Sequence, residues 1–233
     1  MHVAAVGILL VIIAITLVVS EKLAKAGYLS LVLARKVVHI VAISSVAVSP
    51  AFFPNQWLLA GIMLVFTGLL FWAVAAGKLA IDAQRQRKSW GIALFPLSFL
   101  ILLLSFGKTQ PWLVVYPMLV LALADAAAAV VGETLASQYF TLTGDRKSLV
   151  GSFAFTACTF LLLFFLPLWL PGIHAIFTWP LWPSSVAFVW SSIIVIALLA
   201  ALAEALGSGG ADNVTVPLMA AWASASLPIS TKP

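Results

Sequence analysis

The densest group of charged residues in the sequence lies between Asp125 and Ser152, which reads DAAAAVVGETLASQYFTLTGDRKSLVGS. This stretch carries three of the seven acidic residues of a 233-residue chain in which only 8% of the residues are charged. Asp125 falls about two helical turns inside an apolar segment, where an ionised carboxylate is costly unless something pairs with it or uses it. We predict that Asp125 coordinates a metal ion or orients a reacting hydroxyl. The alternative is a structural ion pair with a lysine of a neighbouring helix.

The face of the predicted helix that carries Asp125 is otherwise built from small residues. Ala128, Ala129 and Gly132 follow Asp125 at i+3, i+4 and i+7, so bulky side chains are absent from this face. We therefore expect a backbone, a metal ion or a phosphate group to approach closely there.

The segment GDRKS follows as a short polar loop before the next apolar run. Lys147 and Ser148, with Gly151 and Ser152 one turn later, combine a cation, hydroxyls and the N-terminus of a helix, which are the parts of a phosphate-binding site. Arg146 adds a second cation. The loop lacks the spacing GxxxxGK[ST], so it does not predict a P-loop fold. The alternative is a solvated turn in which Ser148 caps the helix.

A second cationic group, Arg35 and Lys36 with His39 one turn later, begins another predicted helix. Cations at a helix N-terminus oppose the helix dipole, and an anion such as a nucleotide phosphate would relieve this repulsion. The alternative for the two cations is that they only set the membrane topology or contact anionic lipid.

The C-terminal third supplies further polar candidates. Glu204 is a second carboxylate in an apolar segment and is a candidate metal ligand together with Asp125. Asp212 and Asn213 precede the last apolar run, where they either bind phosphate or act as ordinary helix N-caps. Glu133 and Asp145 are expected to be loop charges that could add a metal ligand.

The composition predicts an all-α, polytopic integral membrane protein. The chain is 64% hydrophobic, far above the usage of soluble domains, and it lacks the solvated basic face that a nucleic-acid-binding protein needs. The single cysteine, Cys158, excludes an internal disulfide. We expect one transmembrane catalytic domain over residues 1–233 with seven or eight spans, namely Val3–Val19, Val37–Phe53, Trp57–Ala75, Gly91–Phe106, Pro111–Val131, Gly151–Leu170, Ser184–Leu206 and Val214–Leu227.

The distribution of cations predicts the orientation of these spans. Ten of the twelve Lys and Arg residues lie in the loops after the first, third and fifth spans, and only Lys108 and Lys232 lie on the opposite side. The positive-inside rule then places the N-terminus outside and these three loops in the cytoplasm. The same topology places the candidate site residues on the cytoplasmic face, which we expect to be that of a bacterial inner membrane.

Several of these segments resemble the CTP-dependent polyprenol kinase family, which includes phytol, farnesol and dolichol kinases. DAAAAVVG followed by GDRKSLVGS carries the resemblance, together with RKVVH at Arg35–His39 and ALAEALGSGGADNVTVP at Ala201–Pro217. KSWGIALFP at Lys88–Pro96 is a weaker fourth piece. The pieces occur in the order expected for the family, and phytol kinase is the nearest member.

The resemblance implies a phosphotransferase that moves phosphate from CTP to the hydroxyl of an isoprenoid alcohol such as phytol, farnesol or geranylgeraniol. The alcohol would come from the bilayer, and Mg²⁺ would accompany the nucleotide. Catalytic roles fall to Asp125, Lys147 and Glu204, and nucleotide or phosphate binding falls to Arg35, Lys36, His39, Arg146, Ser148, Gly151, Ser152, Asp212 and Asn213. Two alternatives stay open, a CTP-dependent cytidylyltransferase acting on a lipid phosphate and a membrane transporter.

The sequence departs from the family pattern at one position. Members often carry an acidic residue between the Lys-Ser pair and the following glycine, where this chain has Leu149 and Val150. A catalytic carboxylate is therefore not expected at that point.

The expected topology can be tested by labelling cysteines from outside the cell. In a Cys158→Ala background, a membrane-impermeant thiol reagent applied to intact cells should label a cysteine placed at Ala175 and spare one placed at Thr143. Labelling in the reverse pattern would show that the chain has the opposite orientation in the membrane.

Overall fold

The computed structural model describes residues 2–53, 55–77, 90–135, 138–169 and 186–227. Within these ranges the chain is mostly helical. The helices are α1 (His2–Lys25), α2 (Leu31–Val48), the 3₁₀ turn η1 (Ser49–Ala51), α3 (Gln56–Ala75), α5 (Gly91–Phe106), α6 (Trp112–Leu119), the π-helical turn η2 (Val120–Ala124), α7 (Asp125–Thr134), α8 (Leu149–Trp169), α10 (Val186–Leu206) and α11 (Asp212–Ser226).

Each apolar segment expected from the sequence contains a helix, if α6, η2 and α7 are taken as one continuous unit. In the described ranges, three helical stretches are long and apolar enough to cross a membrane, namely Leu33–Ala51, Gln56–Ala75 and Trp112–Thr134. Shorter apolar helices run over Gly91–Phe106, Leu149–Phe165 and Trp190–Leu206. The architecture is that expected of an all-α membrane protein.

Some positions used in the topology prediction lie outside the described residues. They are Lys78, Arg85–Lys88, His174, Ala175 and Lys232.

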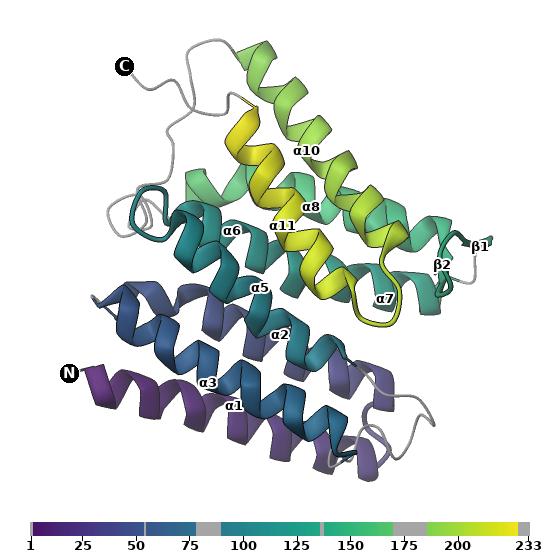
Figure 1. Cartoon of the computed structure of the whole chain (residues 1–233). Helices are drawn as coiled ribbons and strands as arrows, with labels where there is room; N and C mark the ends of the chain where they lie inside the picture. The colour runs from purple at the N-terminus through teal and green to yellow at the C-terminus, as the bar shows by residue number, and fades with distance from the viewer. Residues whose placement is uncertain (1, 54, 78–89, 136–137, 170–185, 228–233) are drawn as a thin grey trace.

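The unit formed by α6, η2 and α7 is the central element of the bundle. Figure 1 shows α1 and α10 at opposite sides of the molecule, with the central unit between them. All seven residues from Trp112 to Met118 are buried. Pro117 lacks a backbone N–H, and the π-helical turn begins three residues after it. Such turns insert an extra residue into a helix and are frequent at functional sites. Here the turn ends directly before Asp125.

The polar segment before α8 is a two-stranded hairpin, which the all-α expectation missed. Strand β1 (Tyr139–Thr141) pairs in antiparallel fashion with β2 (Arg146–Ser148), so that Phe140 lies opposite Lys147. Gly144 has a φ of 131° in the connecting turn, a backbone conformation that glycine adopts without strain.

Two hydrogen bonds attach the hairpin to the connection between α10 and α11. Thr143 Oγ1 donates to the Leu206 carbonyl at 2.7 Å, and the Gly209 N–H donates to Asp145 Oδ2 at 2.7 Å. Asp145 is therefore a structural acceptor in this structure and not a solvated loop charge. The hairpin and the α10–α11 connection are thereby held next to each other.

Helices α7 and α8 pack closely through the small residues that follow Asp125. A Cβ added to Gly151 would lie 2.8 Å from the Ala128 carbonyl oxygen, and one added to Gly132 would lie 2.5 Å from Ser148 Oγ. The backbone of α8 therefore lies directly against this face at Ala128 and Gly132. Close backbone approach, one of the three possibilities left open by the sequence, is observed at these two positions.

This packing makes Gly151 intolerant of a side chain. Gly151→Ala should lower the free energy of unfolding in detergent by about 1–3 kcal/mol, because the new methyl group must displace either α7 or the Ser148 side chain. Gly61→Ala is the matched control, since a Cβ at Gly61 in α3 meets nothing within 4 Å. It should be neutral or stabilising by up to about 1 kcal/mol through helix propensity. Equal effects of the two substitutions would contradict the close approach.

Candidate functional site

Asp125 lies in an ion-pair cluster with two residues of α2. Lys36 Nζ donates to Asp125 Oδ2 at 2.6 Å, and His39 Nε2 lies 3.3 Å from the same oxygen. His39 Nε2 also lies 3.3 Å from the carbonyl oxygen of Leu121 in the π-helical turn. Both neighbours of Nε2 are acceptors, so we assign the proton to this nitrogen. His39 thus connects α2 to both the carboxylate and the irregular turn that precedes it.

A second cluster surrounds Lys147, the central residue of β2. Lys147 Nζ donates to Glu204 Oε1 at 2.6 Å and to Asp212 Oδ2 at 3.3 Å. Glu204 is only 4% exposed, and its other oxygen, Oε2, is buried with no hydrogen-bond partner among the described residues. This oxygen is therefore an acceptor that the ion pair with Lys147 leaves unused.

The charge of Lys147 is maintained by its two carboxylate neighbours. Burial opposes the charged ammonium, but attraction to Glu204 and Asp212 outweighs it, and the pKa of Lys147 is raised above its ordinary value. A raised lysine pKa stabilises the folded protein below the unfolded-state pKa, and this contribution is lost only as the pH rises through the folded-state pKa. Lys147 therefore stays charged throughout the neutral range.

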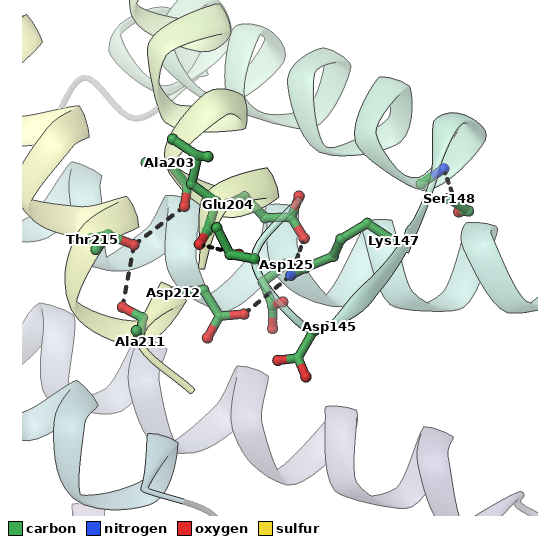
Figure 2. A network of polar contacts seen from close by, with 12 residues as sticks. Asp125, Asp145, Lys147, Ser148, Ala203, Glu204, Ala211, Asp212 and Thr215 are labelled. Carbon is green, nitrogen blue, oxygen red and sulfur yellow. Dashed lines mark hydrogen bonds and ion pairs between the residues drawn. The ribbon is translucent and has the colours of Figure 1, made fainter. Parts of the chain in front are cut away.

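The two clusters form one polar site at one end of the helical bundle. Asp125 interacts electrostatically with Lys147 as well as with Lys36, and Glu204 interacts with Asp125 as well as with Lys147. Figure 2 shows Asp125, Glu204 and Asp212 around the Lys147 side chain. The site is therefore assembled from α2, α7, β2, α10 and α11, which are far apart in the sequence.

The glycine-rich connection GSGG determines where Asp212 and Asn213 lie. Gly210 has a φ of 92°, and an added Cβ there would clash with the backbone of Gly91 at the start of α5. Asp212 is the first residue of α11, and its Oδ1 accepts a hydrogen bond from the Asn213 N–H at 3.1 Å. The N-cap residue of α11 is Ala211, so neither Asp212 nor Asn213 is the side-chain cap that their sequence position suggested. Asp212 instead directs its second oxygen to Lys147.

The remaining predicted phosphate-binding residues have different environments. Ser148 Oγ accepts from the Gly151 N–H at 3.0 Å, so Ser148 caps α8, as the alternative interpretation proposed. Ser152 Oγ is buried, and none of the described residues forms a hydrogen bond with it. Arg146 is exposed and lies over the Tyr139 ring at 3.9 Å, on the face of β2 opposite to Lys147. Arg35 is half-buried beside Lys36, and Glu133 is exposed near the end of α7.

The ion pair between Lys36 and Asp125 joins α2 to α7. Lys36 reaches Asp125 from α2 with its side chain only 18% exposed. Helix α2 begins at Leu31, so Arg35 and Lys36 lie in its second turn and not, as the sequence had suggested, at its start. The anion that Lys36 contacts is Asp125. This is the arrangement of the ion-pair alternative, and it does not by itself decide whether Asp125 also has a chemical role.

Asp125 and Glu204 are the carboxylates that the sequence suggested as metal ligands. Among the described residues, no group of three or more His, Cys, Asp or Glu side chains is arranged to hold a metal ion. Magnesium commonly takes only one or two protein carboxylates and completes its shell with water and substrate phosphates. The unpaired Glu204 Oε2 fits one such ligand position, and Asp125 is the other candidate in the same site.

Sequence analysis missed the features that bring these residues together. The hairpin had a weak signal, because TGD is a turn sequence between two short alternating segments, YFT and RKS. We identify no sequence signal for the π-helical turn or for the contact between Gly91 and Gly210.

Comparison of the chain with protein-family models, with curated proteins and with solved structures gave no match. The functional argument therefore rests on the residues themselves.

The buried position of Lys147 leads to a stability prediction. Lys147→Ala should lower the free energy of unfolding by about 3–5 kcal/mol, because it leaves Glu204 and Asp212 buried without their cation. A Glu204→Gln substitution added to it should restore part of this loss. The measurement is chemical or thermal unfolding in detergent.

Arg146→Ala provides the matched control, since it removes the adjacent but exposed cation. We expect it to cost at most about 1 kcal/mol, the scale of an exposed cation–π contact. If Lys147→Ala unfolds no more easily than Arg146→Ala, the buried ion pairs do not stabilise the fold.

Proposed function

We propose that the protein is a membrane phosphotransferase that transfers the γ-phosphate of CTP to the hydroxyl of an isoprenoid alcohol. The observation that carries this proposal is the convergence of two lysines and three carboxylates, from five separate elements, on one partly buried site. Phosphoryl transfer requires such a combination, because cations must neutralise the donor phosphates and carboxylates must serve the metal ion and the attacking hydroxyl.

The pairing of charges in this site suggests how the donor binds. Lys36 and Lys147 each hold a carboxylate oxygen at 2.6 Å, and a triphosphate offers the same kind of anionic oxygen. We infer that these lysines exchange carboxylate for phosphate oxygens when the nucleotide binds. The released carboxylates, Asp125 and Glu204, would then hold Mg²⁺, which supplies neutralisation of the triphosphate charge.

Asp125 is assigned the acceptor side of the reaction. Lys36 and His39 both approach its Oδ2, which leaves Oδ1 for the hydroxyl of the alcohol. The alcohol oxygen bonds to the γ-phosphorus, the bond from this phosphorus to the β–γ bridging oxygen breaks, and CDP leaves. The hydroxyl proton passes to Asp125. His39 is a positioning residue, because it acts on the reaction by holding this carboxylate.

The apolar surroundings suit an acceptor that dissolves in the bilayer. The site lies at one end of helices that are long and apolar enough to cross a membrane, so an isoprenoid chain can remain among apolar side chains while its hydroxyl reaches Asp125. The resemblance to polyprenol kinases supports CTP as the donor and an isoprenoid alcohol as the acceptor. The proposed location is the cytoplasmic face of the membrane, where the nucleotide is available.

The proposal is tested by following the phosphorus atoms of the donor. Purified protein in detergent should be offered CTP labelled at the γ-phosphate, with phytol, farnesol or geranylgeraniol. We expect the label in an isoprenyl monophosphate and CDP as the second product. ATP and UTP tested in parallel establish which donor is preferred.

Two other outcomes would replace this assignment. Release of labelled pyrophosphate with a lipid phosphate as acceptor would identify a cytidylyltransferase that uses the same residues. Alcohol or nucleotide transport by reconstituted vesicles, without transfer of label to any acceptor, would instead identify a transporter.

A further inference from the structure

A concave site lies at the end of the bundle opposite to the ion pairs. A cavity of about 450 Å³ is formed where α2 and η1 meet the start of α3, and where α5 ends and α6 begins. Its walls include Phe53, Leu59 and Leu103, and its polar groups include Gln56 and Lys108. Trp112 follows this cavity and Asp125 lies 13 residues further along the central helical unit, so the two sites are about 20 Å apart. The cavity is therefore separate from the candidate catalytic site.

The polar groups of the cavity favour an anionic ligand that also donates a hydrogen bond. Lys108 Nζ lies 5.1 Å from the centre of the Trp57 ring, and the segments 49–57 and 106–112 contain no Asp or Glu that could neutralise it. Gln56 Nε2 donates to the Leu103 carbonyl, which fixes the amide. Gln56 Oε1 is buried and has no hydrogen-bond partner within the part of the chain that the structure describes. A fixed, buried acceptor without a partner is costly, and a ligand donor would satisfy it.

The apolar surroundings indicate that this ligand is a lipid. Trp57, at the edge of the cavity, is 65% exposed, and the exposed apolar surface continues along α3 through Leu58, Leu64 and Val65. This helix is long and apolar enough to cross a membrane, and tryptophan is enriched at membrane interfaces. A molecule whose headgroup occupies the cavity can therefore extend its acyl chains along α3.

We propose that this cavity binds the headgroup of an anionic glycerophospholipid that carries a free hydroxyl, with the chemistry of phosphatidylglycerol. The phosphate contacts Lys108, a headgroup hydroxyl donates to Gln56 Oε1, and the acyl chains lie along Trp57 and α3. This inference does not depend on the kinase proposal, because none of these residues belongs to the ion-pair site.

The test measures lipid retention by the whole protein in detergent. Native mass spectrometry with added phosphatidylglycerol should show at least one retained lipid on the unmodified protein, and phosphatidylcholine should be retained less. Lys108→Gln should weaken phosphatidylglycerol binding about fivefold, the scale of one lysine at an anionic membrane surface. Gln56→Leu should weaken binding of phosphatidylglycerol without changing that of phosphatidylcholine.

Lys22→Gln is the matched control, since Lys22 is an exposed cation on α1 outside the cavity. It should leave retention unchanged, and Lys108→Arg should preserve it. Added phosphatidylglycerol should also raise the melting temperature of the unmodified protein more than that of Lys108→Gln, which guards against a variant that folds poorly.

Equal retention of phosphatidylglycerol by the unmodified protein and by Lys108→Gln would overturn the proposal. Equal retention of phosphatidylcholine and phosphatidylglycerol would also overturn it. Protection by inorganic phosphate alone, to the same extent as by the lipid, would assign the site to a soluble anion instead.

Discussion

The buried ion pairs of Lys36 and Lys147 are the interactions on which this structure depends. In a chain that is 64% hydrophobic, each of these charges would be costly in the bundle without a partner, and each has a carboxylate at 2.6 Å. The Lys36 pair joins α2 to α7, and the Lys147 cluster joins β2 to α10 and α11. These contacts hold together segments that are 57 to 89 residues apart in the sequence.

The irregular elements of the fold all lie next to these ion pairs. The π-helical turn ends at Asp125, and one of its carbonyls is within hydrogen-bonding distance of His39. The hairpin carries Lys147, and the Asp145 carboxylate attaches it to the connection in which Gly209 and Gly210 adopt positive φ values. Local departures from regular helix thus orient the charged side chains, while the regular helices provide the apolar scaffold around them.

The helices were predictable from sequence because each apolar run is long and separated from the next by polar or proline-containing segments. Asp125, Glu204 and Lys147 could be singled out from the sequence, since charges are rare in this chain and these three fall in or beside apolar runs, and the structure places all three in the ion-pair clusters. The pairing of Lys36 with Asp125 was not predictable, because it depends on how α2 packs against α7. Arg146 and Lys147 are adjacent in sequence, yet only the alternation of a strand, which was not foreseen, places them on opposite faces.

The most direct test of the account asks whether Asp125 does more than neutralise Lys36. In a Lys36→Gln background, where the cation is absent, Asp125→Asn removes a carboxylate that no longer has its lysine. We predict that this second substitution preserves or raises the free energy of unfolding and lowers phosphoryl transfer by a further factor of about a hundred, the scale of losing a group that acts on transition-state charge. Unchanged transfer between Lys36→Gln and the double variant would show that Asp125 serves the fold alone, and would contradict the catalytic assignment.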